Sequence, residues 1–159
     1  MASVLITTAD AVVEELNNPT GHTWSKTVTA ERNFGDWKLP LENVEDERVY
    51  VDVFPAAAPM TCESETRESV AYRVNIVVVV RYKFRQADSD EDTGRPMDEV
   101  VEEMIEFLEE INEHFSFLRL GDAAWESPPV IAPVDVPLLS NPRQYTGLIR
   151  LTYLVPKTL

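Results

Sequence analysis

The sequence predicts an α+β domain in which two helices pack on a mixed or antiparallel sheet of four to five strands. Residues 70–84 alternate apolar and polar side chains with the period of a strand, and residues 97–115 repeat apolar side chains with the period of a helix. The strand patterns are grouped around this long helix instead of alternating with helices. The resulting order, α-β-β-β-α-(β)-β, is typical of α+β folds and not of doubly wound sheets. The 159 residues fit one domain, residues 1–159, without repeats.

The first expected helix begins at Thr7-Thr8-Ala9-Asp10, where a threonine cap precedes an acid in the first turn. Asn17-Asn18-Pro19 ends it. Its apolar stripe consists of Ala9, Val12, Val13 and Leu16. The helix is only about two to three turns long, so packing must hold it rather than helix propensity.

Two strands are expected next, at residues 24–32 and 48–54, because both segments alternate in polarity. Pro55 ends the second strand, and residues 56–66 are expected to form a connecting loop. From Val70 to Phe84 every even position is apolar or aromatic. This run exceeds the usual strand length, so we expect it to bend or to project beyond the sheet.

The second expected helix opens at Pro96 and ends near Phe115. Its apolar stripe consists of Met97, Val100, Val101, Met104, Leu108, Ile111 and Phe115. The opposite face carries Asp98, Glu99, Glu102, Glu103, Glu106, Glu109, Glu110 and Glu113. We therefore expect the stripe to lie on the sheet and the acids to face water.

The remaining segments surround a last strand. Residues 118–125 are expected to contribute at most a short strand. Five prolines between Ser127 and Pro142 exclude a helix or a central strand, and they predict an extended, polyproline-like arm at about 127–142. Residues 143–154 alternate again and predict the final strand.

The charge is strongly unbalanced, with 28 acids against 14 bases and a net charge of −14. Such a surface repels nucleic acid and anionic membranes, so any contact with DNA is expected to be passive. Cys62 is the only cysteine, which excludes an intrachain disulfide. The chain contains no apolar run of about 20 residues and no signal-peptide pattern, so we expect an intracellular protein without a membrane partner.

One acidic segment resembles a calcium site. Asp88, Asp90, Asp92 and Glu99 stand at positions 1, 3, 5 and 12 of an EF-hand loop. Position 6 needs glycine for the sharp turn but holds Thr93, and the segment before the loop is a strand. We interpret the segment as a solvated acidic loop and expect no metal ion.

Catalytic motifs find little support. Neither His22 nor His114 has a serine or cysteine motif beside it, and the five glycines form no phosphate-binding loop. His114 ends the acidic helix, where a cation suits the helix dipole. The paired glutamates lie on the water face of that helix, where burial does not split their pKa values. We therefore expect no catalytic residue and no cofactor, and a protein that is not an enzyme.

Two oppositely charged surfaces indicate an interface between copies. The basic set lies on the odd positions of the long strand and consists of Arg67, Arg73, Arg81, Lys83 and Arg85. The acidic set lies on the second helix and consists of Glu99, Glu102, Glu103, Glu106 and Glu110. In a head-to-tail ring, the acidic set of one copy would meet the basic set of the next. The alternative, two independently solvated faces, stays open.

Five segments resemble, in order and spacing, the small tail terminator (tail completion) proteins of long-tailed bacteriophages. They are ADAVVEELNN (9–18), TVTAERNFGDWKLPLENVEDERVYVDVFP (27–55), YRVNIVVVVRYKF (72–84), MDEVVEEMIEFLEEI (97–111) and PRQYTGLIRLTYLV (142–155). The resemblance covers nearly the whole chain. It implies two helices on a mixed or antiparallel sheet and assembly into a homo-hexameric ring. The proline-rich stretch 128–142 is longer than the family pattern and is a candidate arm toward a neighbour.

The resemblance also implies a role and partners. Such a ring caps the finished tail tube and presents a docking surface to the head-side connector or stopper protein. The expected location is the tail or neck of the virion, after assembly in the host cytoplasm. DNA passes only through the lumen, and six copies would carry a charge of about −84, which repels phosphates. The second helix and residues 86–95 are both candidates to line the lumen.

Two other roles stay open. The first is a head-tail connector, stopper or other neck protein of the same virion. The second is a small acidic binding domain unrelated to virions, such as a DNA mimic or an inhibitor. A mimic would need acids spaced like phosphates over a surface, whereas eight acids here follow one helix face.

Overall fold

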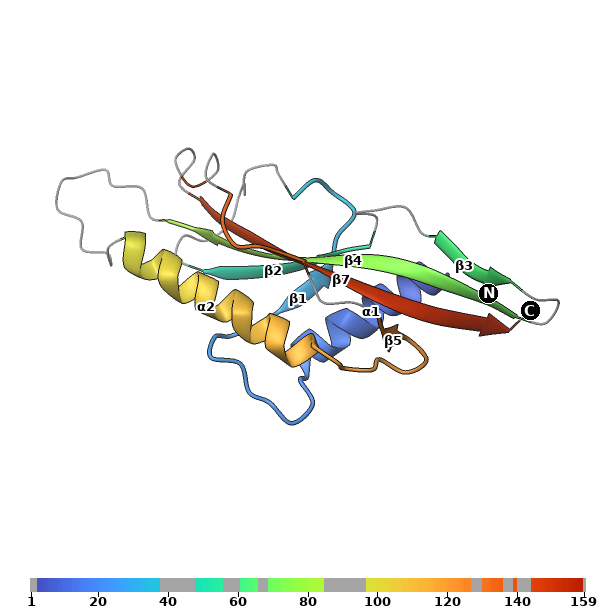
Figure 1. Cartoon of the computed structure of the whole chain (residues 1–159). Coiled ribbons are helices and arrows are strands. Elements are labelled where there is room, and N and C mark those ends of the chain that lie inside the picture. The colour runs from blue at the N-terminus through green and yellow to red at the C-terminus, as the bar shows by residue number, and fades with distance from the viewer. Residues whose placement is uncertain are drawn as a thin grey trace.

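The computed structural model describes residues 3–37, 48–55, 61–65, 69–84, 97–126, 130–135, 139 and 144–158, with the backbone alone at 61–65 and 97. These parts form two helices and one seven-stranded mixed sheet, which confirms the α+β prediction (Figure 1). The elements are α1 (Val4–Asn17), β1 (Ala30–Arg32), β2 (Val49–Phe54), β3 (Thr61–Glu65), β4 (Ser69–Lys83), α2 (Met97–Phe115), β5 (Ala124–Trp125), β6 (Val130–Ala132) and β7 (Gln144–Thr158).

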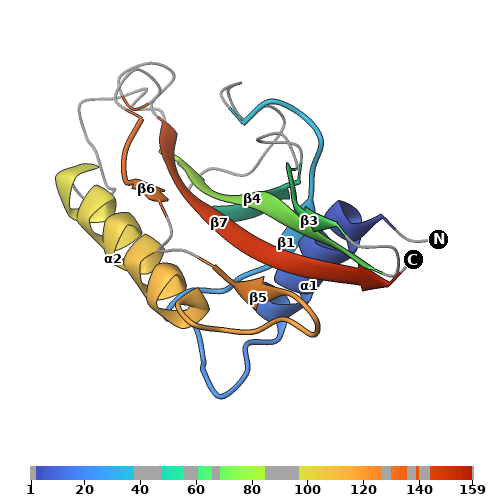
Figure 2. The same ribbon diagram turned by 45° about the vertical axis from the view of Figure 1, so that its right-hand side comes forward.

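Strands β4 and β7 form the spine of the sheet. They pair antiparallel along 15 residues each, from Ser69 opposite Thr158 to Lys83 opposite Gln144. The long strand therefore does not project beyond the sheet, because β7 matches its length. The two strands curve together, as Figure 2 shows.

Short strands line both edges of this spine. The order is β1-β2-β4-β7-β5, and β3 also pairs with β4 while β6 also pairs with β7. Strand β1 runs parallel to β2, and the other pairs are antiparallel, so the sheet is mixed. The loop predicted at 56–66 is wrong in part, because 61–65 is β3. The predicted arm contains β6, an edge strand of three residues, while Pro128, Pro129, Pro137 and Pro142 lie outside the described residues.

Both helices cover the same face of the sheet and enclose the main core (Figures 1 and 2). Helix α1 lies nearest β1, β2 and β4, and α2 lies nearest β7. The spine contributes Val74, Ile76, Val78, Val80, Tyr145, Ile149, Leu151 and Tyr153 to this core. The predicted stripe of α2 is confirmed at its buried positions, and Phe107, which is 1% exposed, belongs to it as well. Burial of such side chains is the main force that stabilises the fold.

Glycine 147 allows one close contact within this core. The ring of Tyr145 lies beside Gly147 on the same strand, and a Cβ there would come within 3.0 Å of Tyr145 Cζ and 3.1 Å of Leu108 Cδ2. The Tyr145 hydroxyl donates a 2.6 Å hydrogen bond to the carbonyl of Pro133, which ties the residues after β6 to β7. Burial raises the pKa of Tyr145, so the hydroxyl remains a donor.

Two local predictions in the first 32 residues are wrong. Helix α1 begins at Val4 instead of Thr7, since the Thr7 N–H already donates to the Ser3 carbonyl at 2.9 Å. The buried Thr8 hydroxyl donates to the Val4 carbonyl inside the helix at 2.8 Å and does not cap it. The strand predicted at 24–32 is confined to Ala30–Arg32. Trp24 instead donates its indole N–H to the carbonyl of Leu16 at 2.7 Å, which holds the preceding segment against α1.

Candidate functional site

Arg81 of the basic set is not on the surface. It lies on the face of the sheet opposite the helices, is 6% exposed, and donates through Nη2 to Asp52 of β2. A small apolar cluster surrounds this pair and consists of Phe54, Val77, Val79, Trp37 and Leu148. The prediction that Arg81 belongs to an exposed basic surface is therefore wrong. Strand β2 places a carboxylate diagonally across from the guanidinium, and the ion pair is buried.

Arg73 of the basic set is also paired within the chain. Its Nε and Nη2 donate to the two carboxylate oxygens of Glu126, just after β5, at 2.7 and 2.6 Å. These hydrogen bonds lower the pKa of Glu126, against a smaller opposite effect of burial. Lys83 lies half-buried at the end of β4, and Arg67 and Arg85 lie outside the described residues.

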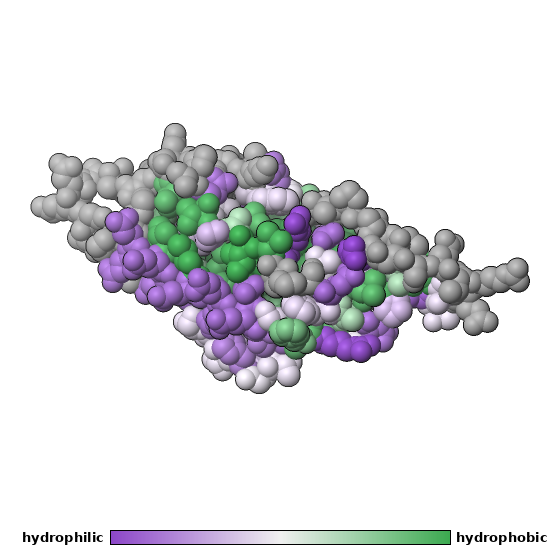
Figure 3. All heavy atoms as spheres, in the orientation of Figure 1, coloured by the Kyte–Doolittle hydropathy of each residue, from purple (hydrophilic) through white to green (hydrophobic). Residues whose placement is uncertain are grey.

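The glutamates of the acidic set fall into two groups, those exposed on α2 and those that bind another segment of the chain. Glu99, Glu102 and Glu106 are exposed, as are Glu109 and Glu113 farther along α2. Glu103 and Glu110 instead bind the segment that connects α1 to β1: Glu103 lies 3.5 Å from Lys26. Figure 3 shows α2 as a hydrophilic surface bordered by a hydrophobic area. The helix thus offers an exposed acidic stripe, which we define as Glu102, Glu106, Glu109 and Glu113.

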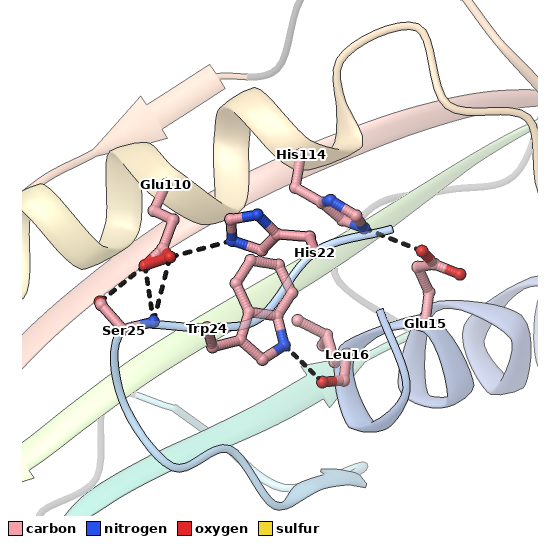
Figure 4. Close-up of polar contacts among 7 residues, drawn as sticks. All are labelled: Glu15, Leu16, His22, Trp24, Ser25, Glu110 and His114. Carbon is pink, nitrogen blue, oxygen red and sulfur yellow. Dashed lines mark hydrogen bonds and ion pairs between the residues drawn. The ribbon is translucent and has the colours of Figure 1, made fainter. Parts of the chain in front are cut away.

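Glu110 joins α2 to the connecting segment, as Figure 4 shows. One carboxylate oxygen lies 3.0 Å from His22 Nε2, and the other accepts the Ser25 hydroxyl at 2.6 Å. The Ser25 backbone N–H donates to both oxygens, at 3.2 and 3.1 Å. The connecting segment is therefore held to α2 by one carboxylate with three partner groups.

His114 and Glu15 make a second contact of this kind between the two helices. His114 Nε2 of α2 lies 2.8 Å from Glu15 Oε1 of α1, and Thr20 donates its N–H and hydroxyl to the same carboxylate. The two imidazoles lie side by side, with ring centroids 5.3 Å apart, and Trp24 packs edge-on against both, at 4.9 Å from His22 and 5.0 Å from His114 (Figure 4). We call His22, Trp24, His114, Glu15 and Glu110 the helix clamp.

Both carboxylates of the helix clamp are stabilised in the charged form. Burial acts to raise the pKa of Glu15 and of Glu110. Hydrogen bonds from Thr20 and His114 outweigh this effect at Glu15, and hydrogen bonds from Ser25 and His22 outweigh it at Glu110. Both pKa values therefore fall below the ordinary 4.5.

The contacts of the helix clamp hold α1, α2 and the connecting segment together, and they do not resemble those of a nucleophilic catalytic site. The Ser25 hydroxyl donates to Glu110 and not to a histidine, so its adjacent base is a carboxylate of lowered pKa and not an imidazole. Each imidazole has its Nε2 against a carboxylate. Among the described residues, no group of three or more His, Cys, Asp or Glu side chains is placed to hold a metal ion, while Asp88, Asp90 and Asp92 lie outside them.

The sequence did not reveal the helix clamp. His114 was assigned to the helix dipole, and its carboxylate partner is 99 residues away in sequence. His22 and Glu110 are separated by 88 residues. A histidine following Pro19-Thr20-Gly21 carries no signal for such a distant partner, so only the fold brings these groups together.

A separate apolar pocket of about 390 Å³ opens beside α1. It is lined by Val4, Thr7, Thr8 and Ala11 of α1, by Leu120, Gly121, Asp122 and Ala123 before β5, and by Val155, Pro156 and Lys157 of β7.

No protein-family model matches the chain, and no match is found among curated proteins. Within the described residues, neither α1 nor α2 is long and apolar enough to cross a membrane.

Proposed function

We propose that this protein is a ring-forming tail terminator of a long-tailed bacteriophage, which caps the tail tube and joins it to the head-side connector. Three features that occur together in this chain support the proposal. Two helices cover one face of a curved sheet, in the order of the five family-like segments, and one helix exposes an acidic stripe. The proposed role is structural and requires no catalytic group.

The distribution of charge supports passage of DNA through such a ring. Proteins adhere to DNA mainly when lysine and arginine neutralise phosphates. Here Arg73 and Arg81 are paired with carboxylates of the same chain, so they offer less positive charge to phosphate. The acidic stripe repels phosphate, and we place its residues Glu102, Glu106 and Glu109 toward the lumen of the ring.

The burial of Arg81 makes this residue unsuitable for testing the interface between copies. Replacing Arg81 by glutamate would bury two carboxylates together and would test folding instead of assembly. Pairing of the acidic set with a neighbour's basic set would use the same exposed residues, such as Glu102 and Glu106, so it is an alternative to a stripe that faces the lumen. Two separately solvated faces stay the alternative.

Binding to purified virion parts tests the proposed function. The protein is mixed with tail tubes that lack a terminator and, separately, with emptied capsids, and each mixture is sedimented. The proposal predicts association with one end of the tail tubes. Association with capsids alone would indicate a neck connector instead, and association with neither would contradict a role in the virion.

A further inference from the structure

Phe117 is exposed and conformationally unfavourable. It follows the end of α2 with φ of 62°, in the left-handed region where residues with a Cβ are disfavoured. Glycine is the usual residue at this position after a helix. The phenyl ring is 82% exposed, although one side of it contacts Trp125, at 4.3 Å between ring centroids. Among the described residues, the contact with Trp125 covers only part of this side chain and leaves most of it open to solvent.

The apolar pocket beside α1 is large enough to accept the side chain of Phe117. Its volume of about 390 Å³ is ample for a phenyl ring, since a cavity of about 150 Å³ already binds benzene. Phe117 and Trp125 do not line it. One chain therefore carries both an exposed aromatic side chain and a separate apolar pocket.

The charges beside the two features are complementary. Phe117 is flanked by exposed Glu113 and Arg119, and the pocket is lined in part by Lys157 and Asp122. Within the described parts of the chain, Glu113, Asp122 and Lys157 form no ion pair. Arg119 uses only its Nε, on the carbonyl of Gly121 at 3.0 Å. One acid and one base thus remain available on each side.

We propose that Phe117 of one copy inserts into the apolar pocket of the next copy. Glu113 then faces Lys157 of the neighbour, and Arg119 faces its Asp122. Phe117 does not line the pocket, so the contact can repeat head to tail; the ring requires this arrangement instead of a two-fold dimer with two reciprocal insertions. This inference rests on the ring-forming function proposed above, and it names the contact that closes the ring.

Complementary variants of the full chain test the contact. Phe117→Ala removes the inserted ring, and Thr7→Trp fills the pocket from an exposed helix position. Each variant alone should weaken self-association by roughly 30-fold or more, as loss of a central aromatic anchor does. Mixed together, they should form 1:1 dimers and nothing larger, because only one productive junction remains. Phe34→Ala, which removes another exposed phenyl ring, should leave assembly unchanged.

A charge exchange tests the register of the same contact. Glu113→Lys and Lys157→Glu should each weaken assembly, and the two changes in one chain should restore it. Masses are measured by native mass spectrometry and, for assembly on tail tubes, by electron microscopy. Unchanged assembly of Phe117→Ala would overturn the contact.

The same measurements separate this contact from the proposed function. Rings of Phe117→Ala that form normally on tail tubes would leave the function standing and reject the contact. Assembly through Phe117 by a protein that ignores tail tubes would support the contact and reject the function. A wild-type chain that stays monomeric both free and on tail tubes would reject both.

Discussion

Arg81 of β4 and Asp52 of β2 form an ion pair on the face of the sheet opposite the helices. Arg81 occupies an odd position of β4, in line with Arg73, yet it is buried with Asp52 whereas Arg73 is half-exposed with Glu126. Alternation assigns a side chain to a face of the sheet but does not tell whether that face is covered. The basic set was therefore only partly predictable from its positions.

Removal of one partner from the buried pair should be severe. Asp52→Ala leaves Arg81 buried without its carboxylate, and we expect a loss of about 3–5 kcal/mol in the free energy of unfolding. Replacing both residues together, Asp52→Leu with Arg81→Met, should cost much less, because no charge is left unpaired. Urea denaturation measures both. As a matched control, Arg73→Met should cost about 1 kcal/mol or less, since its pair is partly solvated.

Gly147 is predicted to be intolerant of even one added methyl group. A Cβ there meets Leu108 and Tyr145, both fully buried, so we expect Gly147→Ala to destabilise the fold by about 1–3 kcal/mol. Thermal unfolding measures the loss. Gly35→Ala is the control, because its Cβ would meet only the Asn33 side chain at 3.0 Å. Equal stability of the two variants would show that the core can relax around Gly147.

At the scale of elements, the strongest periodicities predicted the structure best. Strand β4 and helix α2 lie where their patterns placed them, because each pattern is long and is buried on at least one side. Strand β7 begins as predicted but continues past residue 154 to Thr158, because Val155 to Thr158 pair with the first residues of β4. The short strands β3 and β6 were missed, because they are held mainly by pairing with edges of β4 and β7. Their own residues carry too few alternations to signal a strand.

The segment between α1 and β1 shows the opposite error. Its alternation from Trp24 onward predicted a longer strand than the three residues observed. Hydrogen bonds from Trp24 to Leu16, and from Ser25 to Glu110, hold this segment across the two helices instead. Contacts between residues that are distant in sequence can override a local alternation of polarity, and such contacts cannot be predicted from that alternation.

The helix clamp predicts a dependence of stability on acid. Glu15 and Glu110 have lowered pKa values in the folded protein, so the unfolded chain binds more protons near pH 4. Their stabilisation is present above about pH 4.5 and is lost as the pH falls through the lowered pKa values. We expect about 1 kcal/mol or less from each carboxylate, given partial exposure.

Urea denaturation across pH 3 to 7 measures this dependence. The double variant Glu15→Gln, Glu110→Gln should be less stable than the wild type at pH 7 and should lose less stability toward pH 3. Glu106→Gln, on the exposed face of the same helix, serves as the control and should follow the wild type. Parallel curves for the wild type and the double variant would contradict the assignment.

At the scale of the whole molecule, the placement of α2 toward the lumen predicts an effect on DNA passage. Glu106→Lys with Glu109→Lys converts part of the acidic stripe to positive charge, so the ring should retain DNA and slow its ejection from assembled particles. The effect should weaken at high salt. Glu14→Lys with Glu31→Lys makes the same change of net charge on exposed residues outside α2. Equal slowing by both pairs would place α2 away from the lumen.

We propose that several copies of this chain close into a ring at the end of a tail tube. Electron micrographs of tail tubes incubated with the purified protein, averaged at the tube ends, would show such a ring. We expect six copies seated at one end of each tube, with no further growth of the tube. Bare tube ends, or tubes that continue to lengthen in the presence of the protein, would contradict it.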